Sequence, residues 1–110
     1  MPKHEFGLMD NPPFESERFD EYIPEKYANL ISVEDSVIVQ ISGELNEVQM
    51  YWHTLENPQN GLAYNGITLI SPESASKIQS ITGRYPKLGR LTRLMEKAMT
   101  ERKYIIHFGI

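Results

Sequence analysis

Histidine and tyrosine side chains on two predicted strands are the residues best suited to chemistry in this sequence. His53 and His107 each lie in an apolar, strand-like segment, with Tyr51 and Tyr64 in or beside the same hairpin. Two imidazoles near phenol groups can form a general acid–base site. We therefore retain a candidate pocket of Tyr51, His53, Tyr64 and His107 as one interpretation. The simpler interpretation is that both histidines are structural residues held by hydrogen bonds.

Other residues give no catalytic or metal-binding motif. The chain has no cysteine, which excludes thiolate metal sites and cysteine nucleophiles. His53 and Glu56 run from a strand into a turn, a spacing that matches no metal motif. The segment 61–66 lacks the glycine spacing and lysine of a phosphate loop. We predict no catalytic residue, no metal and no cofactor, and we favour a binding protein over an enzyme.

Charge is distributed unevenly along the 110 residues. Residues 1–36 hold nine acidic and three basic residues, residues 37–70 three acidic and none basic, and residues 71–110 three acidic and eight basic. An acidic first half repels nucleic acid and favours a basic protein partner. The predicted partner-binding residues are Glu15, Glu17, Asp20, Glu21 and Glu25. Arg90, Arg93 and Lys97 share one helix face, which we interpret as a solvated face.

The apolar pattern predicts a series of short elements. A helix is expected over about 33–45, with Ser32 as its N-cap. Strands over 47–55 and 62–70 flank a turn at 57–61 and form a hairpin. Ser71-Pro72 begins a second helix that ends at Gly83, and a third follows Pro86. Further extended segments are expected at 3–8, at 27–31 and, as the final strand, at 104–108.

These elements predict an α+β fold with a small, mainly antiparallel sheet of three to four strands and about three helices. The sequence leaves open a parallel pairing of the final strand with a hairpin strand, because the two helices between them can form the crossover connection. The length suits a single domain over 1–110. We divide it into a body over 28–110 and a wrapping arm over 1–27.

The arm is expected to be ordered although irregular. Its prolines oppose regular helix, but it is too apolar for a disordered tail. Its aromatic residues are expected to pack onto the body: Phe6, Phe14, Phe19, Tyr22 and Tyr27. The acidic residues between them would then be fixed on the surface.

Targeting signals are not evident in the sequence. No apolar stretch approaches the ~18–20 residues that a membrane helix needs. The N-terminus has no basic run leading into an apolar region, so a cytoplasmic protein with no membrane partner is expected.

Four stretches carry a resemblance to known proteins. His4-Glu5-Phe6-Gly7 with Met9-Asp10, 51–55 (YWHTL), 61–64 (GLAY) with 66–70 (GITLI), and 106–110 (IHFGI) resemble a family of small uncharacterised bacterial proteins. That family is similar in size and charge to immunity proteins that neutralise toxins. The resemblance implies an immunity-type inhibitor, a non-enzymatic protein-binding module acting through its acidic face on a basic toxin. Two alternatives stay open: a small enzyme or ligand-binding domain with the His/Tyr pocket, and a module that self-associates through its final strand at a sheet edge.

Overall fold

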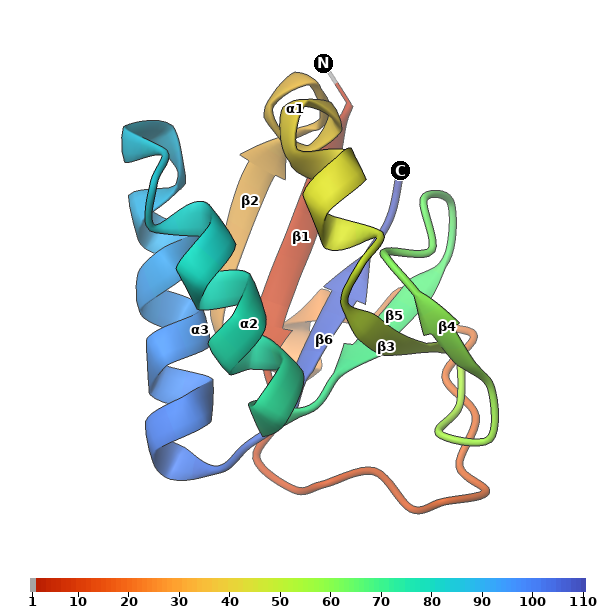
Figure 1. Ribbon diagram of the computed structural model, residues 1–110. Coiled ribbons are helices and arrows are strands. Elements are labelled where there is room, and N and C mark those ends of the chain that lie inside the picture. The colour runs from red at the N-terminus through yellow and green to blue at the C-terminus, as the bar shows by residue number, and fades with distance from the viewer. Residues whose placement is uncertain (1) are drawn as a thin grey trace.

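The chain folds around one antiparallel sheet. The structure, a computed structural model, describes residues 2–110, and in this range six strands pair in the order β2-β1-β6-β5-β3-β4 (Figure 1). Every neighbouring pair is antiparallel. The strands are β1 (Lys3–Leu8), β2 (Ala28–Glu34), β3 (Gln49–Trp52), β4 (Pro58–Asn60), β5 (Ile67–Ile70) and β6 (Ile105–Phe108).

The prediction of three to four strands is wrong, because long-range pairing creates strands that local patterns do not show. Residues 58–60, expected as part of a turn, form β4 by pairing with β3. Val33 and Glu34, expected in a helix, belong to β2 because they pair with His4 and Lys3 of β1. Hydrogen bonds to a neighbouring strand outweigh the weak local preference in both places.

The final strand lies inside the sheet. Phe108 of β6 pairs with Glu5 on one side and with Ile67 on the other, in both cases antiparallel. The parallel pairing that the sequence left open is therefore wrong. Self-association through this strand is excluded as well, because both of its hydrogen-bonding edges are already used.

Three helices pack on one face of the sheet (Figure 1): α1 (Asp35–Leu45), α2 (Pro72–Thr82) and α3 (Gly89–Glu101). Ser71 caps α2 as predicted, its hydroxyl accepting a hydrogen bond from the Ser74 N–H at 3.1 Å. Ser32 does not cap α1. The N-cap is Glu34, because β2 continues past Ser32. No helix in residues 2–110 is both long and apolar enough to cross a membrane.

Two apolar clusters cover opposite faces of the sheet. The larger one lies under the helices and includes Phe6, Met95 and Ile105. The smaller one lies on the other face and includes Leu69 and Ile106. Successive residues of a strand point to opposite faces. Because both faces are covered, all four residues of β5 and of β6 are buried.

The arm supplies much of the cover on the second face. Residues 3–8 of the predicted arm are strand β1, and the chain from Met9 to Tyr27 crosses the smaller cluster. Phe19 and Tyr27 pack against that cluster as expected. The expectation is wrong for Phe14 and Tyr22, whose exposed fractions are 76% and 62%. Tyr22 still contacts Phe108 edge-on, with ring centroids 5.1 Å apart.

A pair of phenylalanine substitutions tests this arrangement. Phe6→Ala removes a ring that is 1% exposed in an interior strand, and we expect it to lower the free energy of unfolding by about 3–5 kcal/mol. Phe14→Ala truncates an exposed ring and should change it by less than about 0.5 kcal/mol. Urea unfolding followed by circular dichroism measures both. Equal effects would contradict the assignment of β1 to the sheet interior.

Candidate functional site

Two histidines from opposite ends of the chain meet in the core. His4 of β1 and His107 of β6 are both fully buried. The His4 Nδ1 and His107 Nε2 atoms are 2.8 Å apart, and the rings stack with an interplanar angle of 18°. His107 Nδ1 lies 3.0 Å from the hydroxyl of Thr68 on β5. Three adjacent strands are thus joined through side chains on the helix-covered face.

The chain of hydrogen bonds reaches the surface at the start of α1. His4 Nε2 lies 2.9 Å from Oδ1 of Asp35, and the Tyr64 hydroxyl donates to Oδ2 of the same carboxylate at 2.7 Å. The bond from His4, and then that from Tyr64, holds the pKa of Asp35 below its usual value. Asp35 is therefore a stable carboxylate at neutral pH.

One set of tautomers satisfies this whole histidine chain, defined here as Asp35, His4, His107 and Thr68. The Ala63 N–H donates to Thr68 Oγ1 at 2.8 Å. In residues 2–110 the only acceptor recorded for the Thr68 hydroxyl is then His107 Nδ1. His107 must consequently carry its proton on Nε2 and donate to His4, which donates through its own Nε2–H to Asp35.

His107 is neutral in this arrangement. Burial, and then the proximity of His4, lowers the pKa of His107 to about 3. All four ring nitrogens are occupied by protein partners, so neither ring has a free nitrogen for a substrate or a metal. No metal-holding group of histidine or carboxylate side chains is present in the described part of the chain. The arrangement suits a structural connection between β1, β5, β6 and α1.

The structure does not gather the four residues of the predicted pocket. Tyr64 and His107 both contact His4, Tyr64 with its ring centroid 5.5 Å away. Tyr51 packs in the smaller cluster on the opposite face of the sheet. His53 contacts the arm instead, with its Nδ1 2.9 Å from the Phe19 carbonyl oxygen.

Sequence analysis did not identify His4 and Asp35, the two residues that connect the histidine chain to the surface. His4 alternates with Phe6 and Leu8 in a segment recognised as strand-like, and that alternation was the available signal for an inward-pointing histidine. Asp35 lies in the first turn of α1. Its contact with His4 depends on β1 lying next to β2, which no local pattern shows.

A second candidate site lies on the arm. We define the arm surface as the exposed side chains of residues 10–27. All five acidic residues predicted to bind a partner are exposed there. Asp20 is engaged by Arg18 at 2.7 Å and by His53 at 3.2 Å, and Glu17 accepts from the Phe14 N–H. Glu15, Glu21 and Glu25 have no cationic partner within 4 Å in residues 2–110.

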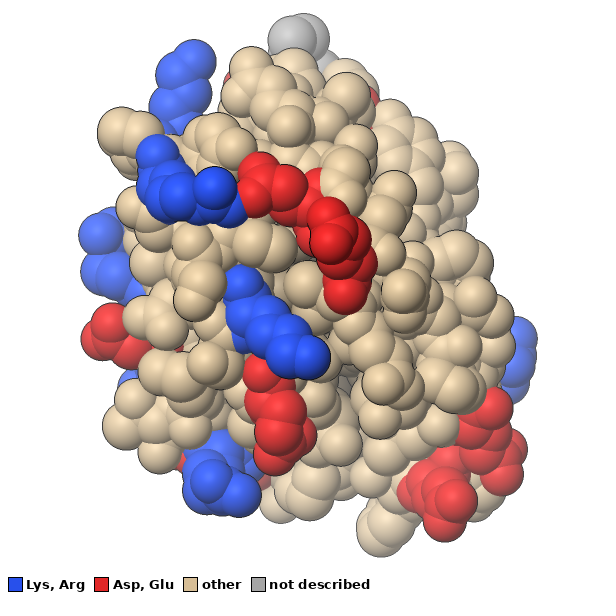
Figure 2. Space-filling model, in the orientation of Figure 1, with Lys and Arg blue, Asp and Glu red and all other residues tan. Residues whose placement is uncertain are grey.

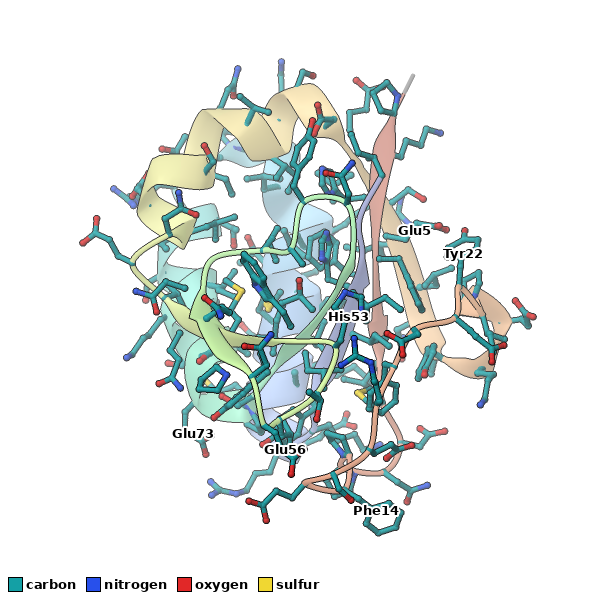
Figure 3. All side chains as sticks on the ribbon, turned by 90° about the vertical axis from the view of Figure 1, so that its right-hand side faces the viewer. Glu5, Phe14, Tyr22, His53, Glu56 and Glu73 are labelled. Atoms are coloured by element: carbon teal, nitrogen blue, oxygen red, sulfur yellow. The ribbon has the colours of Figure 1, made fainter. Side chains whose placement is uncertain are left out.

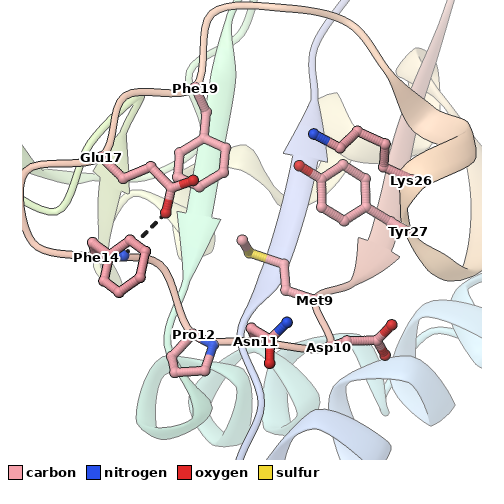
Figure 4. Close-up of a pocket in the computed structure, with 9 residues that line it drawn as sticks. All are labelled: Met9, Asp10, Asn11, Pro12, Phe14, Glu17, Phe19, Lys26 and Tyr27. Atoms are coloured by element: carbon pink, nitrogen blue, oxygen red, sulfur yellow. Dashed lines mark hydrogen bonds between the residues drawn. The ribbon is translucent and has the colours of Figure 1, made fainter.

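The arm surface contains a groove of about 550 Å³. Met9 lies between Phe19 and Tyr27 in the groove, and Phe14 stands at its rim (Figure 4). Figure 3 shows the Phe14 ring at the outer end of the arm, directed away from the sheet. Asp10, Glu17 and Lys26 supply its charged lining. The groove can accept an apolar side chain and surround it with mainly acidic groups.

No protein-family model, curated protein or solved structure matches this chain.

The buried histidine predicts a dependence of stability on pH. The unfolded chain binds a proton at His107 below about pH 6.5, whereas the folded chain does not until about pH 3. The free energy of unfolding should therefore fall as the pH drops through this window. This single group contributes a slope of at most about 1.4 kcal/mol per pH unit. Asp35, whose folded pKa is lowered, adds to the loss only as the pH falls below its ordinary pKa.

Urea unfolding at pH 6.5, 5.5 and 4.5 checks this expectation. His107→Asn removes the titrating ring and should flatten the slope relative to the wild type. His53→Gln removes a half-buried histidine outside the chain of bonds and should keep most of the slope. An unchanged slope in His107→Asn would contradict a neutral buried His107.

The tautomers give a direct spectroscopic prediction. Long-range ¹H–¹⁵N correlation spectra at pH 7 should show His4 and His107 both neutral with the proton on Nε2. Thr68→Val removes the hydroxyl that donates to His107, and the Nε2 tautomer should then be less strongly preferred. A charged imidazolium at either ring would contradict the assignment.

Proposed function

We propose that this chain is a non-enzymatic protein-binding module whose arm surface docks a basic protein partner. The observation that carries the proposal is the Phe14 ring, 76% exposed at the rim of the groove. An exposed aromatic ring beside a groove whose charged lining is mainly acidic has the composition of a protein interface rather than of inert surface.

The chemistry of the arm surface defines the partner. An apolar side chain of the partner would enter between Phe19 and Tyr27. Lysine or arginine residues of the partner would meet Asp10 and Glu17 in the groove, and the exposed Glu15, Glu21 and Glu25 elsewhere on the arm surface. These carboxylates would raise the association rate by attracting a basic surface at low ionic strength.

The arm is held in place before binding. The Phe19 N–H donates to the His53 carbonyl oxygen at 2.7 Å, and the Met9 N–H donates to that of Tyr104 at 2.9 Å. Arg18 also forms a β-bridge with Thr54. A segment tied to the body at several points loses less conformational entropy on binding than a free acidic tail.

Within this class we propose an immunity-type inhibitor that acts in the cytoplasm on a basic bacterial toxin. Support comes from the small size, the acidic first half and the resemblance of four sequence stretches to a family similar to immunity proteins. The histidine chain favours this class over a small enzyme, since its rings have no free nitrogen.

Site-specific photo-crosslinking tests the arm surface directly. Phe14→benzoylphenylalanine places a crosslinker at the groove, and mass spectrometry of the products from the source cell should identify one basic protein. Val39→benzoylphenylalanine is the matched control, because Val39 is exposed on α1 and should not capture that protein. Capture by both positions alike, or by neither, would contradict the proposal.

Charge variants test the electrostatic part. Glu15, Glu21 and Glu25 replaced together by Gln should slow association with the captured partner by about tenfold or more at low salt. Replacing the exposed Glu34, Glu47 and Glu96 by Gln removes the same charge outside the arm and should change the rate far less. For the immunity proposal, the partner should inhibit growth when expressed alone, and co-expression of this chain should restore growth.

A further inference from the structure

A second groove lies between the edge strand β2 and helix α3. It has a volume of about 330 Å³ and is lined by Leu30 and Ile31 of β2 and by Leu94 of α3. Its charged lining is entirely basic: Arg90, Arg93 and Lys97. Figure 2 shows that lysine and arginine side chains gather on the side of the molecule formed by α2 and α3.

The cations lie on one face of α3 because their spacing is three and four residues. Lys97 forms an ion pair with Glu101 at 2.6 Å. Arg90 and Arg93, by contrast, have no carboxylate within 4 Å in residues 2–110. The acidic arm does not neutralise them. Two guanidinium groups are thus left free beside an apolar groove.

The neighbouring strand has an open edge. β2 pairs with β1 on one side only, since it is the first strand in the sheet order. From Ile31 to Glu34 its register with β1 is regular, so the backbone groups of alternate residues face outward without a sheet partner. An extended peptide adds to such an edge through main-chain hydrogen bonds.

We propose that β2 and α3 together bind an extended acidic peptide segment. The segment adds to the sheet as a seventh strand beside β2. Its alternate side chains, about 7 Å apart along the strand, point toward α3. Acidic residues at these positions meet Arg90 and Arg93, which pair well with carboxylates because the guanidinium can donate two parallel hydrogen bonds.

Charge favours an acidic peptide over a second copy of the chain as the occupant of this groove. Two β2 edges pairing about a two-fold axis would bring the basic faces of both α3 helices toward each other. That contact places like charges together, and β2 itself offers only Glu34 to offset them. A strand rich in carboxylates has no such repulsion.

Peptide titration tests the proposal. The probe is a nine-residue peptide of alternating glutamate and valine, compared with its lysine–valine counterpart. The acidic peptide should bind and shift the amide resonances of Asn29–Glu34 and of α3, and the basic peptide should not. Arg90→Gln with Arg93→Gln should weaken binding at least about tenfold. Lys77→Gln with Lys87→Gln removes two exposed cations outside the groove and should leave it unchanged.

N-methylated peptides separate strand addition from simple charge attraction. Methyl groups on alternate amides of one parity block hydrogen bonding to β2, while methyl groups on the other parity face solvent. One of the two peptides should therefore bind like the parent and the other should lose affinity.

Several results would overturn the proposal: equal affinity of both N-methylated peptides, tighter binding of inorganic phosphate or a single-stranded oligonucleotide at the groove, or self-association through β2 in sedimentation. The variant with Glu15, Glu21 and Glu25 replaced by Gln should bind the acidic peptide normally. Failure of arm binding and failure of edge binding are thus distinguishable.

Discussion

The central constraint on this structure is that β5 and β6 are buried on both faces. Every side chain of these two strands is buried, so each face of the sheet needs its own apolar cover. Helices provide it on one face, where Ile105 packs, and the chain from Met9 to Tyr27 provides much of it on the other, where Ile106 packs. Burying these side chains contributes on the order of 1.5–3 kcal/mol for each large one. The irregular arm is therefore part of the core.

The two ends of the chain lie side by side in the sheet. β1 and β6 are neighbours in the sheet although Glu5 and Phe108 are separated by almost the whole sequence. Pairing of this kind requires closure of a very long loop, which slows folding. The histidine chain lies at this junction and connects β1, β5 and β6 with the start of α1. A fully bonded polar network in a core favours one register over its neighbours, since a slip would leave its members unpaired.

The two candidate binding surfaces follow from the same layout. The acidic arm surface covers one face of the sheet, and the basic groove lies beside β2 on the helix side. The charged lining of the arm groove is mainly acidic, and that of the groove beside β2 is entirely basic. The arm covers the core and also presents side chains to solvent. The residues around Phe14 hold the arm in place, while the Phe14 ring itself remains exposed.

The sequence by itself determined the local elements whose signals lie within a few residues. Ser71 and Pro72 marked the start of α2, a third helix was correctly expected after Pro86, and the acidic residues of the arm were correctly identified as surface groups. Each of these depends on a cap, a period or a charge that short segments carry on their own. The apolar run at the C-terminus likewise indicated a buried strand.

Only the tertiary structure decided which segments meet. β4 exists because β3 is beside it, and α1 begins after Ser32 because β2 continues along β1. His107 contacts His4 rather than His53 because β1 pairs with β6, and the exposure of Phe14 depends on where the arm crosses the sheet. Such contacts join residues far apart in sequence, and the free energy of each contact depends on both segments that form it. A single segment read alone therefore carries no record of them.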